Sequence, residues 1–259
     1  MLGLGHNIAT PMVSGEIPYS NDYYYTGTHA TATFVNTNSA MQSLFRSDWT
    51  FSGWFNLDDG QTNPPNSLFG AKHDSNNHIF VSTTKNDSKL YIDYKANGDV
   101  HSNITSAIAW SDGATGWFHI AITMSIPGSG NVSTVTYVNG SAVATTTTNT
   151  CTVLNAGSFT NTQGVYIGGI YSGGAIESLR GDMDDVAFHS KALSASEVSD
   201  IYNGGVSIDL TTHGASSDLV HYYTFNEQSG KDFGSGESNA TFAEEGYSFN
   251  AHSSPTSAP

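Results

Sequence analysis

Apolar and polar residues alternate along several short stretches of this chain, and no other feature limits its fold as strongly. The clearest stretch is 117–126, in which every second residue is apolar. Successive side chains of a β-strand point to opposite faces, so a period of two predicts a strand with one buried face. The apolar residues in phase are Phe118, Ile120, Ile122, Met124 and Ile126.

Residues 49–55 repeat the alternation with aromatic side chains. Trp49, Phe51 and Phe55 share one face, which we expect to lie in the core. Trp54 falls on the opposite face of this strand, as Trp117 does in its own strand. Each of these two tryptophans is expected either to line an open sheet face or to be covered by loops.

Turn residues separate the predicted strands. Residues 132–138 form one strand, and Asn139-Gly140 follows directly. This dipeptide favours a type I′ hairpin turn, which needs positive φ at both central positions, and residues 143–148 are predicted to return as the partner strand. Many short strands with turns between them are typical of a sandwich or barrel. The other strand candidates are residues 79–83, 89–94, 164–168, 183–188 and 219–225.

The chain is acidic, with 8 Lys and Arg against 23 Asp and Glu and a formal net charge of −15. Nucleic-acid binding needs clustered basic residues, so this balance argues against nucleic acid as a partner and against an anionic membrane surface. No stretch approaches the length of a membrane span. A single cysteine, Cys151, allows no internal disulfide.

One short helix is predicted near residues 194–203. A capping box of Ser194 and Glu197 begins it, and a glycine pair ends it. Glycine and proline interrupt residues 1–20 too often for a regular element, so we predict an extended N-terminal arm there. Residues 250–259 are predicted to be a flexible tail.

Several segments share the order and spacing of motifs in one known family. The best match runs from Gly181 to Phe188 and precedes the predicted helix. The others are Asn21-Asp22-Tyr23, Asp48 to Phe55, Trp117 to Ala121, Tyr137 to Gly140 and Val165 to Gly169. Together they resemble the laminin G-like members of the concanavalin A-like lectin/glucanase superfamily. Leu219 to Glu227 also resembles a strand of this family, one that usually comes near the start of the domain.

This resemblance implies two antiparallel sheets packed face to face. We therefore predict an all-β chain, an antiparallel jelly-roll sandwich of the concanavalin A-like type with one short surface helix. The domain is expected over residues 21–249, with a motif core at 21–205 and added strands at 206–249.

Asp184 is the most informative carboxylate. In a strand it falls in phase with Val186 and Phe188, so we expect it to point into the sandwich, where a carboxylate needs a partner. Either backbone N–H groups and hydroxyls satisfy it, or a cation does, and oxygen ligands suit Ca²⁺. The resemblance also implies calcium, because many family members hold a structural calcium near this strand. Asp22 is the expected second ligand.

No catalytic residues are predicted. The glucanase branch of the family places two Glu around an Asp at alternate strand positions, which brings acid and nucleophile to one face. The nearest segment here is Asp182 to Asp185, which has no Glu and whose shared face is expected to point inward. A zinc site and a Ser-His-Asp triad both lack the spacing that they need.

Aromatic residues outside the predicted core are the candidates for ligand binding, since flat rings suit the apolar faces of sugars. Tyr24 belongs to a run of three tyrosines, and Trp110 precedes a Ser-Asp-Gly turn. With Trp54 and Trp117 they are the four predicted ligand-binding residues.

Three functions fit these features. The first is a non-enzymatic phage virion component, a decoration, fibre or appendage protein whose lectin-like domain binds glycans or a host surface. It would attach to other virion proteins through the arm at 1–20 and form a homo-oligomer. The first five residues, Met-Leu-Gly-Leu-Gly, resemble those of marine phage structural proteins and show no secretion signal.

The second function is a carbohydrate-binding or adhesion module of a secreted, extracellular protein. The third, a glycan hydrolase, has the least support, because it needs the paired acids that we do not find.

Overall fold

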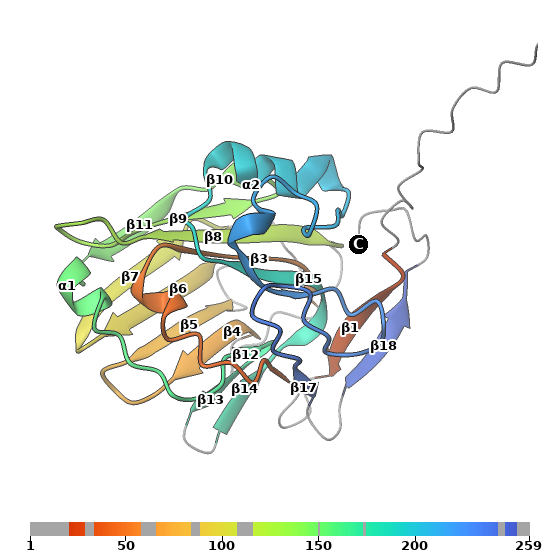
Figure 1. The fold of residues 1–259 in the computed structure, drawn as a ribbon, viewed down its shortest axis with the longest axis horizontal. Helices are drawn as coiled ribbons and strands as arrows, with labels where there is room; N and C mark the ends of the chain where they lie inside the picture. Colours follow the sequence, from red (N-terminus) through yellow and green to blue (C-terminus); the bar gives the residue numbers. More distant parts are fainter. Residues whose placement is uncertain are drawn as a thin grey trace, which may run out of the picture.

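The computed structural model describes residues 21–28, 34–57, 66–83, 89–107, 116–149, 151–172, 175–242 and 247–252. Across these residues, two large antiparallel sheets pack face to face (Figure 1). This arrangement confirms the predicted all-β antiparallel sandwich. Within the described stretches, no helix has the length and hydrophobicity needed to cross a membrane.

The first sheet, sheet A, follows the order β10-β9-β8-β3-β15-β1-β18, and β16 also pairs with β15. Its strands are β1 (Tyr23–Thr28), β3 (Trp49–Leu57), β8 (Phe118–Ser125), β9 (Ser133–Val138), β10 (Ser141–Ala142), β15 (Arg180–His189), β16 (Leu219–Tyr223) and β18 (Tyr247–Ala251). Strands from both ends of the described chain therefore lie side by side, with β1 between β15 and β18.

The second sheet, sheet B, follows the order β11-β7-β6-β5-β4-β12-β2-β17. Its strands are β2 (Val35–Asn36), β4 (Asn66–Lys72), β5 (His78–Thr83), β6 (Leu90–Ala96), β7 (Asp99–Thr105), β11 (Thr145–Asn149), β12 (Tyr166–Ile167) and β17 (Thr241–Phe242). A separate hairpin of β13 (Gly169–Ser172) and β14 (Ala175–Ser178) lies against β4. The strands predicted after residue 205 thus join both sheets.

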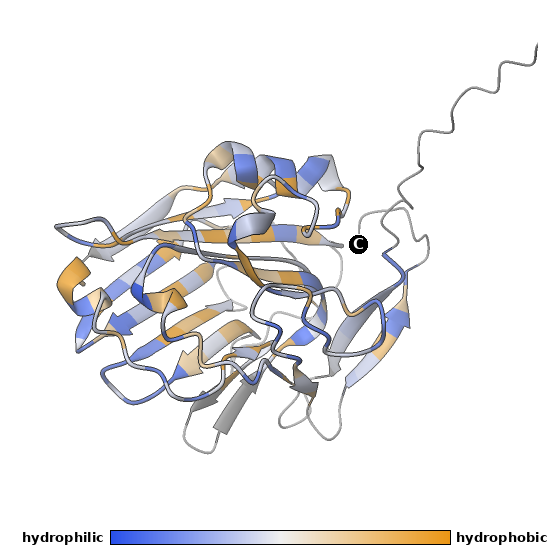
Figure 2. Ribbon diagram, in the orientation of Figure 1, coloured by the Kyte–Doolittle hydropathy of each residue, from blue (hydrophilic) through white to orange (hydrophobic). Residues whose placement is uncertain are grey.

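The core lies between the two sheets and follows the alternation in the sequence, which Figure 2 shows as changes of colour along the strands. Trp49, Phe51 and Phe55 have no exposed surface, as predicted. Phe51 of sheet A packs on Phe69 of sheet B with 4.4 Å between ring centroids. Each such side chain stabilises the fold by about 1.5–3 kcal/mol through burial, so the inner faces hold the sheets together.

The predicted hairpin at Asn139-Gly140 is present, but its return strand is short. Both residues have positive φ, 48° and 73°, as a type I′ turn requires. Of the residues that follow the turn, only those of β10 pair with β9. Residues 145–149 cross to sheet B and pair with β7, so the prediction that 143–148 partners β9 is wrong. The four threonines of this segment are exposed, which suits the edge position that β11 takes in sheet B.

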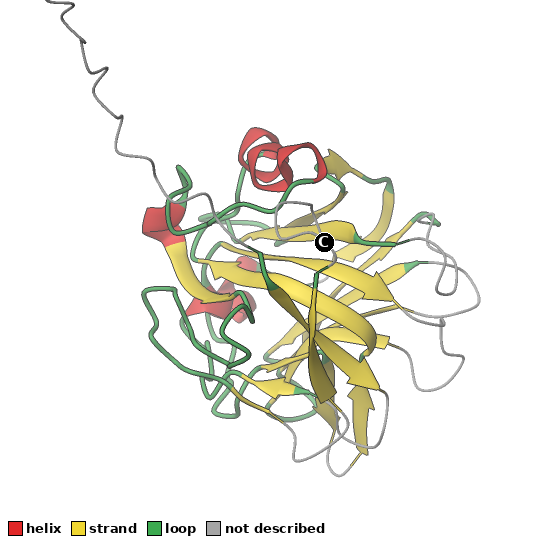
Figure 3. Cartoon of the chain, turned by 90° about the vertical axis from the view of Figure 1, so that its right-hand side faces the viewer, coloured by secondary structure: helices red, strands yellow, loops and turns green. Residues whose placement is uncertain are grey.

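The predicted surface helix is α2 (Ala195–Tyr202), and its capping box is confirmed. Ser194 Oγ accepts a hydrogen bond from the Glu197 N–H, and the Glu197 carboxylate accepts one from the Ser194 N–H. Helix α2 lies over the outer face of sheet A (Figure 3), where Val198 and Ile201 pack with residues of the sheet. The other helical segments are α1 (Val153–Ala156) and 3₁₀ turns at Leu44–Arg46, Asn203–Gly205 and Ser216–Asp218.

A β-bulge in β15 reverses the predicted orientation of Asp184. Asp184 pairs with Trp54, and three residues later Ala187 pairs with Ser52, so β15 contains one extra residue there. Asp185 has φ 48° at this point, a conformation that Asp tolerates better than most residues. Asp184 therefore lies on the outer face of sheet A, and the prediction that it points into the sandwich is wrong. Asp182 shares this outer face.

The C-terminal boundary also differs from the prediction. We expected a tail from residue 250, but β18 continues to Ala251, and His252 packs on the outer face of sheet A. The strand predicted at 219–225 is β16, which pairs with β15 beyond the bulge. The predicted arm at 1–20 lies outside the described residues.

Candidate functional site

Helix α2 and the segment after it cover one half of the outer face of sheet A. Ala121, Ala187 and Tyr222 of the sheet pack there with apolar residues of the covering segment. Trp54 lies at the margin of this half under Tyr202, with ring centroids 5.7 Å apart, and is only 3% exposed. Of the two alternatives for Trp54, the covered one is correct, with a helix as the cover. Trp54 is therefore not accessible to a ligand.

Three rings meet on the other half of this face, and we call them the aromatic triad. Tyr24 of β1 lies edge-on to Trp117, with 5.2 Å between centroids, and 4.7 Å from His252. Trp117 and His252 are 5.7 Å apart. Tyr24 and Trp117 are half-buried, whereas the His252 side chain is only 4% exposed. Two predicted ligand-binding residues, Tyr24 and Trp117, are thus brought together from distant parts of the chain.

A chain of hydrogen bonds crosses four strands beside the triad, and we call its members the polar row. Asp182 Oδ1 accepts from Thr26 Oγ1 at 2.6 Å, and Asp182 Oδ2 accepts from Asn56 Nδ2 at 3.0 Å. Asn250 Nδ2 donates to Thr26 Oγ1 at 2.7 Å. Since Asn250 is also the cross-strand partner of Tyr24, the row and the triad form one continuous surface.

Asp184 lies beneath this surface with no exposed area. Its Oδ2 is 2.9 Å from His252 Nε2, and its Oδ1 accepts from the N–H of Asp185 at 2.9 Å. Burial raises the pKa of Asp184 well above its usual value, and the charge of Asp185 raises it further. Burial lowers the pKa of His252, against the influence of Asp22. The uncharged forms of both groups are therefore favoured, and their contact anchors the end of β18.

The predicted calcium ligands, Asp22 and Asp184, differ in their surroundings. The Asp22 side chain is exposed, whereas both Asp184 oxygens already take part in hydrogen bonds. The described parts of the chain contain no group of three or more His, Cys, Asp or Glu side chains suited to a metal ion. The side chains around Asp184 do not favour a cation there, and calcium at this position stays a prediction.

An acidic pocket of about 410 Å³ opens next to the triad. Asp22 links the two, because it lines the pocket and its carbonyl accepts a hydrogen bond from the His252 N–H at 3.0 Å. The pocket also contains Asp209, Glu227, Asn226, Tyr222 and Phe233. Its carboxylates and aromatic walls lie on the same outer face of sheet A as the triad.

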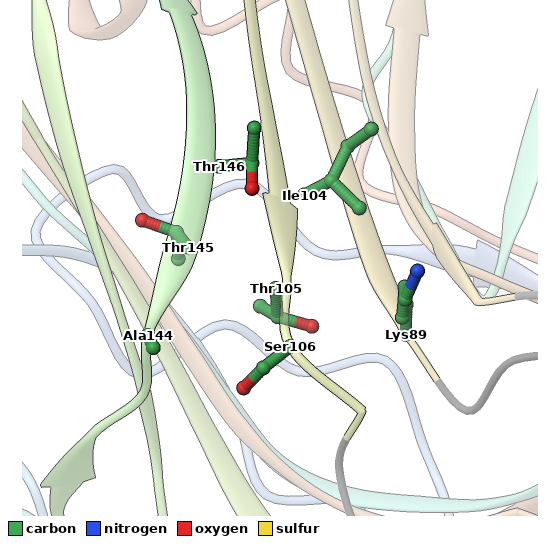
Figure 4. Close-up of a pocket in the computed structure, with 7 residues that line it drawn as sticks. All are labelled: Lys89, Ile104, Thr105, Ser106, Ala144, Thr145 and Thr146. Atoms are coloured by element: carbon green, nitrogen blue, oxygen red, sulfur yellow. The ribbon is translucent and has the colours of Figure 1, made fainter.

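A second pocket, of about 340 Å³, lies at β6, β7 and β11 of sheet B (Figure 4). Lys89 and Ile104 line it with five small Thr, Ser and Ala residues. None of these seven lining residues is aromatic, so this pocket has no ring on which a sugar could stack. Within the described residues, helix α2 and the segment after it do not cover the half of the outer face of sheet A that carries the triad, and we call this the open half of sheet A. It is the stronger candidate for ligand binding.

Sequence reasoning missed two parts of this surface. His252 fell in the predicted tail, although Ser248, Asn250 and His252 alternate with Tyr247 and Phe249 as a strand would. Asp182 was expected to point inward as a structural or calcium-linked carboxylate. It lies on the outer face instead, and its hydrogen-bond partners come from strands far away in sequence. Trp110, the fourth predicted ligand-binding residue, lies outside the described residues.

Solved structures with the same fold include several proteins linked to carbohydrates. A protein from Bacteroides ovatus proposed to bind carbohydrate is 20% identical, with a TM-score of 0.54 over 93% of this chain. The chain spans 60% of that protein. The CBM40 domain of the Ruminococcus gnavus IT-sialidase, bound to α2,3-sialyllactose, is 12% identical, with a TM-score of 0.52 over 71% of this chain and 99% of that domain.

The leech intramolecular trans-sialidase is 16% identical, with a TM-score of 0.53 over 72% of this chain and 28% of that protein. At such identities the likeness shows the fold alone. No curated protein matches the chain. The sequence profile of the concanavalin A-like lectin/glucanase superfamily, in its laminin G-like form, matches residues 27–199. The chain belongs to the concanavalin A-like lectin/glucanase superfamily.

Proposed function

We propose that this chain is a non-enzymatic carbohydrate-binding protein and that it binds glycans at the aromatic triad and the polar row. The observation that carries the proposal is the packing of Tyr24, Trp117 and His252 beside a hydrogen-bonded row on an open sheet face. Three structural neighbours linked to carbohydrates share the fold and support this choice.

The surface offers both kinds of contact that a sugar needs. The half-exposed rings of Tyr24 and Trp117 give flat apolar area for the C–H face of a pyranose. Asp182, Asn56 and Asn250 give hydrogen-bonding groups for its hydroxyls. The mutual bonds of the polar row hold these groups in place before a ligand arrives. Such preorganisation reduces the entropy lost on binding.

The burial of Asp184 favours binding over hydrolysis. Asp182 and Asp184 lie two residues apart on one face, a spacing that a glycosidase pair would use. Because Asp184 has no exposed surface, no glycosidic oxygen can reach its carboxyl group. A general acid must lie within hydrogen-bond reach of the leaving group. We therefore infer that Asp182 and Asp184 do not form a catalytic pair.

We further propose the setting that the sequence suggests, a phage virion surface with residues 1–20 as the attachment to other virion proteins. A secreted adhesion module is the alternative. Deletion of residues 1–20 tests the attachment: incorporation into particles is expected to stop, and unchanged incorporation would remove the reason for this proposal.

Glycan binding is tested with single substitutions on the outer faces of sheet A and sheet B. We expect Tyr24→Ala and Trp117→Ala each to weaken binding by about tenfold or more, since aromatic residues at the centre of a contact carry about 2 kcal/mol. Binding is first screened on a glycan array and then measured by calorimetry with the best glycan found.

Tyr91→Ala is the matched control, because Tyr91 is a half-buried tyrosine on the outer face of sheet B. It should bind as the unchanged chain does. If Tyr91→Ala abolished binding while Tyr24→Ala and Trp117→Ala did not, the ligand would bind on the other sheet and the proposed surface would be wrong.

A further inference from the structure

We propose that the open half of sheet A selects neutral glycans over glycans that carry a carboxylate or a sulfate, and that Asp182 is a specificity-determining residue. This inference rests on the glycan-binding role proposed above. The charges of this surface determine the class of glycan that it accepts. Neither the fold nor the family determines that class.

Carboxylates surround the aromatic triad. Asp182 lies in the polar row, and Asp22, Asp209 and Glu227 line the adjoining pocket. Asp182 and Asp209 are half-buried, and the other two are exposed. A ligand stacked on Tyr24 therefore has acidic side chains on two sides.

The hydrogen bonds of Asp182 suit its ionised form. An ionised carboxylate is only an acceptor, and both Asp182 oxygens accept from neutral donors, Thr26 Oγ1 at 2.6 Å and Asn56 Nδ2 at 3.0 Å. Its charge also acts on Tyr24 of the triad. The pKa of Tyr24 is raised, first by burial and second by the negative charge of Asp182. The negative potential of Asp182 therefore extends to the ring on which the sugar would stack.

Two basic residues lie on this side of the molecule. Lys231 Nζ lies 4.2 Å over the ring of Phe233 near the pocket, and Arg180 lies two residues before Asp182 on the same face of β15. Acidic ligands are usually held by Arg or Lys in bidentate or paired contacts. Four carboxylates, the three of the pocket and Asp182, outnumber Lys231 and Arg180, in a chain with 23 acidic and 8 basic side chains. This balance disfavours an anion on the triad.

The size of the effect follows from Coulomb's law. Two like charges repel each other, and the repulsion is about four times stronger near a protein surface than in bulk water. Repulsion of 1.4 kcal/mol corresponds to about a tenfold loss of affinity. We therefore expect at least a tenfold preference for the neutral member of a matched glycan pair.

The test compares matched glycans, each printed on an array with and without a terminal sialic acid or sulfate. Binding to neutral members and loss of it in Trp117→Ala would support both proposals. Binding through Trp117 that favours the acidic members would overturn the neutral preference but not the glycan-binding role. Absence of any Trp117-dependent binding would overturn the glycan-binding role and this inference with it.

Two charge variants test whether Asp182 and a pocket carboxylate set the preference for neutral glycans. Asp182→Asn and Glu227→Lys should each reduce the neutral-to-acidic affinity ratio by about threefold or more, because each removes or reverses one negative charge. Asp74→Asn, in the loop between β4 and β5, is the control with the same charge change and should leave the ratio unaltered. A ratio that stays constant in all three variants would overturn the role of Asp182.

Salt gives an independent readout. Screening at about 0.5 M NaCl shortens the range of the repulsion, so the neutral-to-acidic ratio should fall toward one. A ratio that does not respond to salt would mean that shape, not charge, sets the preference.

Discussion

At the scale of single residues, the bulge at Asp184 and Asp185 decides what the outer face of sheet A contains. Sequence alternation places Asp184 with Val186, because a regular strand has a period of two. The extra residue shifts the phase by one and turns Asp184 outward, toward His252. No local pattern marks that shift. It depends on partners that are remote in sequence, Tyr222 and Ser207, whose hydroxyls donate to the Asp185 carboxylate.

The state of Asp184 leads to a stability prediction. Its folded-state pKa is raised by burial, so the stability that it contributes is full below its unfolded pKa and is lost as pH rises through the folded value. Asn mimics the protonated form. Asp184→Asn is therefore expected to raise the free energy of unfolding at pH 7 by about 1.4 kcal/mol or more, the value of one pKa unit, and to give little gain near pH 4.

Urea denaturation of both proteins at the two pH values measures this difference, with and without added Ca²⁺. A loss of stability in Asp184→Asn at pH 7, or a Ca²⁺-dependent stability that the substitution removes, would show that a charged Asp184 holds a cation or a protonated His252.

At the scale of elements, the sequence predicts strands and caps well but not their partners. The hairpin turn at Asn139-Gly140 and the capping box at Ser194 are local, so residue types alone specify them. The crossing of residues 145–149 to sheet B depends on which edge is free, and that is a property of the assembled sheets. The cover over Trp54 is likewise set by where α2 packs.

The capping box makes α2 a good subject for measurement. Ser194→Ala removes the side chain that accepts from the Glu197 N–H and should lower the free energy of unfolding by about 1 kcal/mol. Ser199→Ala, at an exposed position of the same helix, is the control and should have no effect or a small stabilising one. Thermal denaturation followed by circular dichroism compares the two. Equal melting temperatures for both variants would contradict the role of the cap.

At the scale of the whole molecule, three buried histidines couple the fold to pH. Burial lowers the pKa of His101 and His189 to about 4 and that of His119 to about 3. A depressed folded-state pKa gives stability that is full above the unfolded value of 6.5 and is lost as pH falls toward the folded value. As pH falls from 6 to 4, the free energy of unfolding should therefore decrease by up to about 1.4 kcal/mol per pH unit for each of these histidines.

Urea denaturation from pH 7 to pH 4 measures this slope. His189→Leu places an apolar side chain where neither ring nitrogen has a hydrogen-bond partner among the described residues, and it should remove about a third of the slope. A slope unchanged by this substitution would mean that His189 is already charged, or is not buried, in solution.

The fold of the whole molecule is easier to predict from the sequence than its binding surface. Each strand shows its own alternation and turns, so the sandwich can be predicted strand by strand. The open half of sheet A forms only when β8, β3, β15, β1 and β18 have assembled in that order and α2 covers the other half. Tyr24 and Trp117 were predicted individually, but their contact with each other and with His252 was not.

The most direct test of the glycan-binding surface is an NMR titration with the best glycan found, followed through the indole N–H signals of the tryptophans. The Trp117 signal is assigned with Trp117→Phe. Binding at the triad predicts a shift of the Trp117 signal, while those of the buried Trp49 and Trp54 stay in place. A titration that shows saturable binding and leaves the Trp117 signal unmoved would contradict the proposed surface.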